Sequence, residues 1–99
     1  KTQIVLSSIN LDQELNTADF AFNPKDGKIY FIDYNDGWFK RIDINENYGQ
    51  IKKVKKIEAA YTVVAAFDVD GNFYYNRGEA IKKLSIQYND SKMIKSSIT

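Results

Sequence analysis

The sequence contains neither cysteine nor histidine. Without cysteine the chain can form no disulfide bond and no thiolate zinc site. Without histidine it lacks the commonest general base and metal ligand, which excludes a His-dependent catalytic triad within these 99 residues. No apolar run approaches the ~18 residues that a membrane-spanning helix needs, so we expect no membrane insertion.

The chain also has no marked excess of positive or negative charge, because it contains 14 basic and 13 acidic residues. This balance gives no reason to expect a nucleic acid or an anionic membrane as partner. The absence of cysteine fits both the cytosol and many bacterial surface proteins. What the sequence does have is aromatic residues, at 14%, together with isoleucine and valine. These residue types favour β-sheet.

Glycine is scarce, with five residues, but its placement is informative. Three Asp-Gly pairs, at Asp26-Gly27, Asp36-Gly37 and Asp70-Gly71, each lie between segments that contain apolar or aromatic residues. Asp-Gly favours the two-residue type I′ turn of a β-hairpin, because both turn positions need positive φ. Tyr48-Gly49 and Arg77-Gly78 predict further breaks between strands.

Short strand-like segments lie between these breaks, with a spacing of about ten residues that is typical of a sandwich, barrel or propeller. We expect strands over Thr2–Ile9, Asp19–Phe22, Lys28–Tyr34, Trp38–Ile44, Ile51–Ile57, Val63–Val69, Asn72–Asn76, Ala80–Ile86 and Lys92–Ile98.

An internal repeat relates these segments. Tyr74 lies 44 residues after Tyr30, and Ile86 lies 42 residues after Ile44, each in a similar context. Thr2–Ile9 resembles a further copy of the last strand of the repeat. A period in the low forties with four strands per unit is typical of propeller blades.

The sequence therefore predicts an all-β chain of two four-stranded antiparallel propeller-like blades. The first blade spans residues 19–57, the second spans 63–98, and residues 1–10 supply the outer strand of a preceding blade. Two blades leave apolar faces uncovered. We therefore expect further blades in the same polypeptide, or other copies or chains, to close the ring. A small β-sandwich with an internal duplication is the alternative.

The segment Ala18–Asp33, followed by Phe39–Ile44, resembles the repeat of several propeller families. The strand Ile29–Asp33 is similar to the Ile-Tyr-Trp-Thr-Asp strand of YWTD propellers. The NHL propellers and a group of bacterial surface-protein propellers of unassigned function are also similar. The resemblance implies a fold and an extracellular or cell-surface location, but not an activity.

Four residues at predicted hairpin tips are candidate ligand-binding residues: Tyr34, Asp36, Trp38 and Arg77. An aromatic side chain at a loop tip can stack on a sugar or anchor a protein partner. The alternative for Trp38, the only tryptophan, is that it opens a strand and packs between blades.

Asp68, Asp70 and Asn72 resemble the start of a calcium loop, in which carboxylate and amide oxygens alternate along the chain. Gly71 stands at the fourth place of this pattern, whereas the calcium loop has its glycine at the sixth. A simple hairpin turn is therefore the alternative, and otherwise we expect no cofactor.

These features predict a non-catalytic binding or scaffolding module of a bacterial surface or secreted protein, with protein or glycan partners. One alternative is a lectin-like unit that closes a propeller by oligomerising. The other is a segment of a calcium-dependent propeller hydrolase or lactonase, whose site residues lie in other blades.

Overall fold

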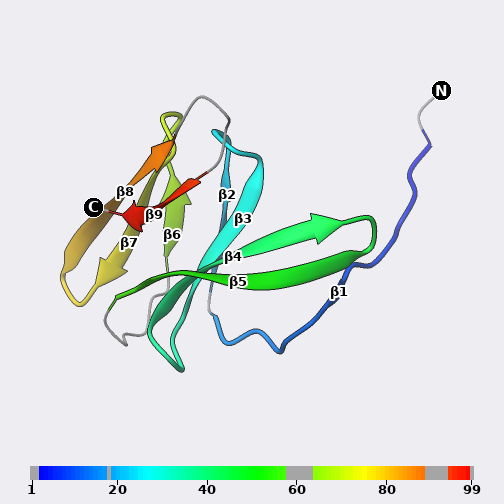
Figure 1. The fold of residues 1–99 in the computed structure, drawn as a ribbon, viewed down its shortest axis with the longest axis horizontal. Helices are drawn as coiled ribbons and strands as arrows, with labels where there is room; N and C mark the ends of the chain where they lie inside the picture. The colour runs from blue at the N-terminus through cyan, green and yellow to red at the C-terminus, as the bar shows by residue number, and fades with distance from the viewer. Residues whose placement is uncertain (1–2, 18, 58–63, 89–93, 99) are drawn as a thin grey trace.

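The computed structural model describes residues 3–17, 19–57, 64–88 and 94–98 (Figure 1). These residues form strands and turns without any helix, which confirms the all-β prediction. The strands are β1 (Asn10–Leu11), β2 (Phe20–Asn23), β3 (Lys28–Asp33), β4 (Trp38–Asn45), β5 (Tyr48–Lys56), β6 (Ala65–Phe67), β7 (Asn72–Arg77), β8 (Ala80–Tyr88) and β9 (Ile94–Ile98).

The strands form two sheets. Sheet one has the order β1-β5-β4-β3-β2, and sheet two has the order β6-β7-β8-β9. Within each sheet, chain neighbours pair antiparallel, whereas β1 pairs parallel to β5 through Asn10 and Leu11. The prediction of two four-stranded sheets was wrong for sheet one, because β1 adds a fifth strand.

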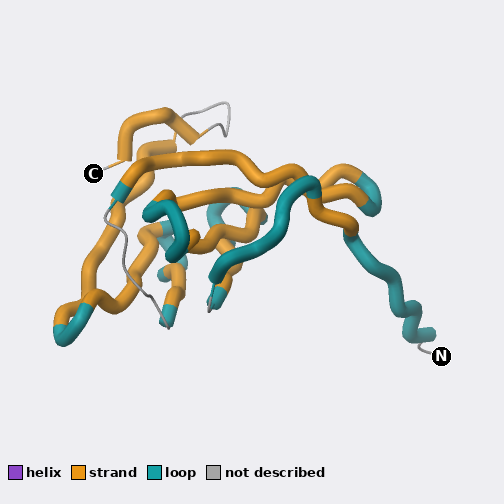
Figure 2. Tube along the Cα trace, turned by 90° about the horizontal axis from the view of Figure 1, so that it is seen from below, coloured by secondary structure: helices purple, strands orange, loops and turns teal. Residues whose placement is uncertain are grey.

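The predicted strand Thr2–Ile9 is not found in the described residues Gln3–Ile9, which pair with no other segment and leave the body of the sheets beyond β1 (Figure 2). Pairing begins only at Asn10, whose N–H donates to the carbonyl of Asn47 at 2.9 Å. The likeness of this segment to the last strand of the repeat is therefore not matched by a pairing with a neighbouring strand.

The two sheets pack face to face through aromatic side chains. Tyr30 and Phe39 of sheet one stack with ring centroids 5.2 Å apart. Phe39 in turn lies 4.6 Å from Phe73 of sheet two, and Tyr30 lies 5.1 Å from Phe67. Tyr30, Phe39 and Phe73 are completely buried, so this shared core joins the two halves of the chain.

The opposite face of sheet one carries a second apolar cluster. Phe31, Ile42 and Ile51 are buried there, and Leu11 and Leu15 from the N-terminal segment pack against them. Sheet one is thus apolar on both faces, since neighbouring residues of a strand point to opposite sides. Sheet two covers only one of these faces.

The turns differ from the predicted type I′ geometry. The Asp-Gly pairs at Gly27 and Gly37 end four-residue loops, in which only the glycine has positive φ, 76° in both cases. Two-residue turns occur instead after Asn45, where Glu46 has a φ of 58°, and after Arg77. A four-residue loop needs positive φ at one position, so Asp can precede Gly without entering the left-handed region.

The sequence predicted a break between strands at Gly49, but in the structure this glycine lies inside β5. A Cβ atom at this position would lie 2.7 Å from Leu11 Cδ2 and 3.1 Å from Ile42 Cγ2. The glycine is therefore required by the close approach of the N-terminal segment to sheet one, and not by a turn.

Candidate functional site

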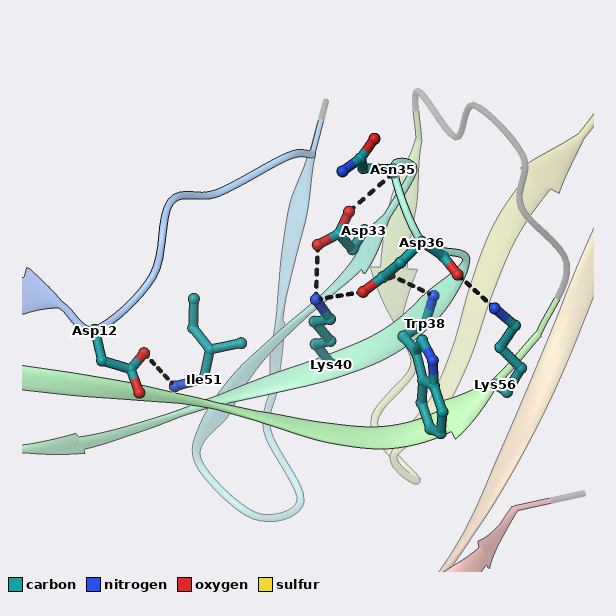
Figure 3. A network of polar contacts seen from close by, with 8 residues as sticks. All are labelled: Asp12, Asp33, Asn35, Asp36, Trp38, Lys40, Ile51 and Lys56. Atoms are coloured by element: carbon teal, nitrogen blue, oxygen red, sulfur yellow. Dashed lines mark hydrogen bonds and ion pairs between the residues drawn. The ribbon is translucent and has the colours of Figure 1, made fainter.

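The loop between β3 and β4 holds three of the four predicted ligand-binding residues (Figure 3). The N–H of Gly37 donates to the carbonyl of Asp33 at 2.8 Å and closes the loop. The Asp33 carboxylate accepts the N–H of Asn35 at 2.9 Å, and the Asp36 carboxylate accepts the N–H of Trp38 at 3.1 Å. Both acidic residues therefore stabilise the turn with one oxygen and keep the other for a second partner.

That second partner is Lys40, which the sequence did not single out. Its Nζ atom lies 2.7 Å from Asp33 Oδ2 and 2.9 Å from Asp36 Oδ2 (Figure 3). The side chains of Lys40 and Asp33 are each only 6% exposed, whereas that of Asp36 is 37% exposed. The loop is thus closed over a buried ammonium group held between two carboxylates.

The ion pairs determine the protonation of this cluster. Burial disfavours the charged form of Lys40, but hydrogen bonds and charges from Asp33 and Asp36 outweigh it and raise the pKa of the ammonium. Desolvation likewise opposes ionisation of Asp36, but the hydrogen bonds from Lys40 and from the Trp38 N–H outweigh it and lower its pKa. Lys40 therefore keeps its proton at neutral pH and is not available as an amine nucleophile or a general base.

Trp38 opens β4 and is half-buried. Lys53 Nζ lies 5.0 Å from the centroid of its ring, which is within the range of a cation–π interaction. Lys56 Nζ donates to the Asp36 carbonyl at 2.6 Å, so β5 supplies two ammonium groups to this end of the sheet. The indole is held against its own sheet by these contacts, and its role in ligand binding stays a prediction.

The remaining candidate residues lie further apart. Tyr34 is exposed in the same loop as Asp36. Arg77 ends β7 and belongs to the β7–β8 hairpin of sheet two. The structure therefore brings Tyr34, Asp36 and Trp38 together in one loop and places Arg77 in the other sheet.

The predicted calcium residues lie in the turn between β6 and β7. Asp68 Oδ1 accepts the N–H groups of Asp70 and Asn72, at 3.0 and 2.9 Å. Its Oδ2 accepts Asn72 Nδ2 at 3.1 Å and the Tyr74 hydroxyl at 3.0 Å. These hydrogen bonds, led by that from the Asn72 N–H, lower the pKa of Asp68 to about 2. All four interactions organise the turn itself, and calcium binding stays a prediction.

The structure also contains an apolar pocket that the sequence did not indicate. It has a volume of 190 Å³ and lies on the face of sheet one that is opposite to sheet two. Its lining comes from the N-terminal segment and from β2, β3 and β4: Ile9, Leu11, Leu15, Phe20, Ile29, Ile42 and Ile44. The sequence feature that could have indicated a covered second face is the run of consecutive apolar residues in β2 and β3, which is typical of strands that are covered on both faces.

No family model, no curated protein and no solved structure matches this chain. Within the described residues there is no helix that is long and apolar enough to cross a membrane. The same residues contain no group of three or more acidic side chains arranged to hold a metal ion.

Proposed function

We propose that this chain is a non-catalytic binding and scaffolding module that acts through the apolar faces of its sheets. The observation that carries the proposal is the second apolar face of sheet one. The N-terminal segment covers this face only in part, because the pocket residues Ile9, Phe20 and Ile44 stay 45%, 48% and 45% exposed. Large exposed apolar surface on a small domain is typical of an interaction site.

Two blade-like repeats are the finer form of the proposal. The two sheets share the register of their first three strands: Tyr30 pairs with Arg41 as Tyr74 pairs with Lys83. Each sheet is a run of antiparallel strands, apart from the added β1. These features support a propeller-type array, in which every blade covers the face of its neighbour. A closed two-sheet sandwich accounts less well for the second apolar face.

The surroundings of Lys40 and Asp68 support a non-catalytic role. Lys40 is neutralised by Asp33 and Asp36, and the Asp68 carboxylate is occupied by donors of its own turn. A general base or nucleophile needs a pKa close to the working pH. The shifts of Lys40 and Asp68 lead away from that range, upward for the lysine and downward for the carboxyl.

Binding of the uncharged apolar dye Nile red to the native chain tests the proposal. At low micromolar protein concentration we expect dye fluorescence to rise with a saturable dependence on dye. Ile44→Lys, at a pocket residue that is 45% exposed, should weaken dye binding. Losing the apolar contact of one isoleucine, about 1.5 kcal/mol, corresponds to roughly tenfold weaker binding.

Val69→Lys is the matched control, since Val69 is 83% exposed and lies in the β6–β7 turn, away from the pocket lining. It should leave dye binding unchanged. Circular dichroism would establish that both variants keep the native sheet content. Absence of dye binding by the native chain, or equal effects of the two variants, would refute the proposed surface.

A further inference from the structure

The two faces of each sheet can be matched through the strand register. Ile29 pairs with Ile42 as Phe73 pairs with Leu84, and these pairs define one face of each sheet. We call it the aliphatic face, after Ile42 and Leu84 at its equivalent positions. Tyr30 and Tyr74 lie on the other face, which we call the tyrosine face. The tyrosine face includes Ala21, Tyr30, Ile32, Phe39 and Arg41 in sheet one, and Ala66, Asn72, Tyr74, Asn76, Ile81, the exposed Lys83 and Ser85 in sheet two.

Within the chain, unlike faces meet. The tyrosine face of sheet one packs against the aliphatic face of sheet two, and the buried core contains Tyr30 and Phe39 from the first and Phe73 and Leu84 from the second. The described residues thus make one tyrosine-to-aliphatic interface and place no sheet against the other face of either sheet.

The two remaining faces are one of each kind, as are the two faces that meet within the chain. The aliphatic face of sheet one carries the pocket lined by Ile29, Ile42 and Ile44. On the tyrosine face of sheet two, Ala66 is exposed and Ile81 is 69% exposed.

The tyrosine hydroxyl is satisfied in the same way on both tyrosine faces. Tyr30 donates to Asp26, and Tyr74 donates to Asp68, each a carboxylate of the preceding turn. A Tyr74 ring that is covered by another sheet would therefore bury no unpaired hydroxyl.

We propose that a second copy of this chain occupies the pocket-bearing face of sheet one, by placing the tyrosine face of its own sheet two against it. The inference rests on the proposed function and names the partner of that surface. The contact is heterologous, because a different face is used on each copy. It therefore leads to a ring or an open chain of copies, not to a two-fold dimer.

The contact between copies should be weaker than the one within the chain. Where sheet one has Ile32 and Phe39 on its tyrosine face, sheet two has Asn76 and Ile81. The replacements reduce both apolar area and ring contacts, and interface strength depends on such buried anchors. We therefore expect association that depends on concentration, whereas the two sheets within one chain stay together.

Sedimentation equilibrium of the full chain tests this inference. The mass of the native protein should rise with concentration. Ile44→Lys alters the aliphatic face and Ile81→Lys the tyrosine face, and each alone should raise the dissociation constant by roughly thirtyfold or more, as removal of a central anchor does. Both positions are partly exposed in the single chain, so each variant should fold.

The decisive sample is an equimolar mixture of the two variants. Each then supplies the face that the other has lost, and the mixture should form a heterodimer and stop there. Val69→Lys, at a residue that is highly exposed in the β6–β7 turn, should associate like the native protein. A native chain that stays monomeric, or a mixture that does not associate, would overturn the inference. If Nile red binding still depends on Ile44 in that case, the proposed surface stands and its partner is a different protein.

Discussion

Replacing Lys40 by methionine tests how much the buried ion pair of the β3–β4 loop contributes to stability. Methionine keeps the length of the side chain but leaves the Asp33 carboxylate, which is 6% exposed, without its ammonium partner. Removing one partner of a buried pair costs about 3–5 kcal/mol. Asp36 is 37% exposed and can regain water, so we expect the lower end of this range, about 3 kcal/mol.

Urea unfolding followed by circular dichroism measures this loss. With an m-value of about 1.5 kcal/mol/M, a loss of 3 kcal/mol lowers the unfolding midpoint by about 2 M. Lys53→Met is the matched control, since Lys53 is exposed and only stacks on Trp38. Its removal should cost less than about 1 kcal/mol.

A double variant separates the charge from the packing. Asp33→Asn combined with Lys40→Met removes both buried charges, and it should be more stable than Lys40→Met alone, because the one carboxylate left unpaired is that of Asp36, which is 37% exposed and can be hydrated. A midpoint of Lys40→Met within ~0.3 M of the native value would refute the structural role of this pair. So would a double variant that loses the sum of the two single effects.

Three further predictions concern the turns. Tyr88→Phe removes the hydroxyl that donates to the Gly71 carbonyl at 2.9 Å and accepts the completely buried Asn23 amide at 2.7 Å. The unsatisfied amide should lower the free energy of unfolding by about 1–3 kcal/mol in thermal or urea melts. Glu46→Gly relieves a φ of 58° and should raise the free energy of unfolding by about 0.5–1 kcal/mol. A loss of stability would contradict the turn geometry. The pKa of Asp68 is depressed to about 2, so its stabilisation is present above its ordinary pKa of 3.8 and is lost as the pH falls through 2. The difference in urea midpoint between the native chain and Asp68→Asn should therefore shrink from pH 5 to pH 2, and a constant difference would contradict this assignment.

The sequence predicted most of the strands because their ends carry local signals. The Asp-Gly pairs and the alternation of apolar residues locate β3, β4, β7 and β8 to within about two residues. The same signals predicted the wrong turn type, because Asp-Gly also suits a four-residue loop in which only the glycine has positive φ. Local sequence determines where a chain turns more strictly than how it turns.

Features that depend on distant contacts could not be predicted in this way. Thr2–Ile9 carries a strand-like pattern, but a strand exists only where a neighbour accepts its hydrogen bonds, and that neighbour is found for Asn10–Leu11 alone. The repeat also predicted that Ile44 and Ile86 are equivalent. In the structure Ile86 pairs with Ile98, whereas Ile44, its counterpart, pairs with Gly49. The last strand of each unit therefore has its own register.

Lys40 shows why the candidate site was only partly visible. In the sequence Lys40 is one of several lysines that lie in predicted strands, and such a lysine is ordinarily expected to be solvated. Its burial follows from two carboxylates that the loop aims at one point, Asp33 from the end of β3 and Asp36 from the loop itself. Trp38 was visible as a candidate, and the strand that carries Lys53 was predicted in the same blade, but the register that brings Lys53 over the ring was not.

The repeat separates residues that build the array from residues that are particular to one unit. The aliphatic face is repeated, with Ile42 and Leu84 at equivalent pairs. The loop end is not repeated: the pair Asp33–Trp38 of sheet one corresponds to Arg77–Ala80 in sheet two.

Packing between repeats needs only the equivalent apolar positions, so a buried ion pair and a single tryptophan at one loop serve no part of that packing. A structural feature that is present in only one repeat can distinguish that repeat from its neighbours. If the apolar faces determine how copies associate, the β3–β4 loop is therefore where a partner other than this chain would be recognised.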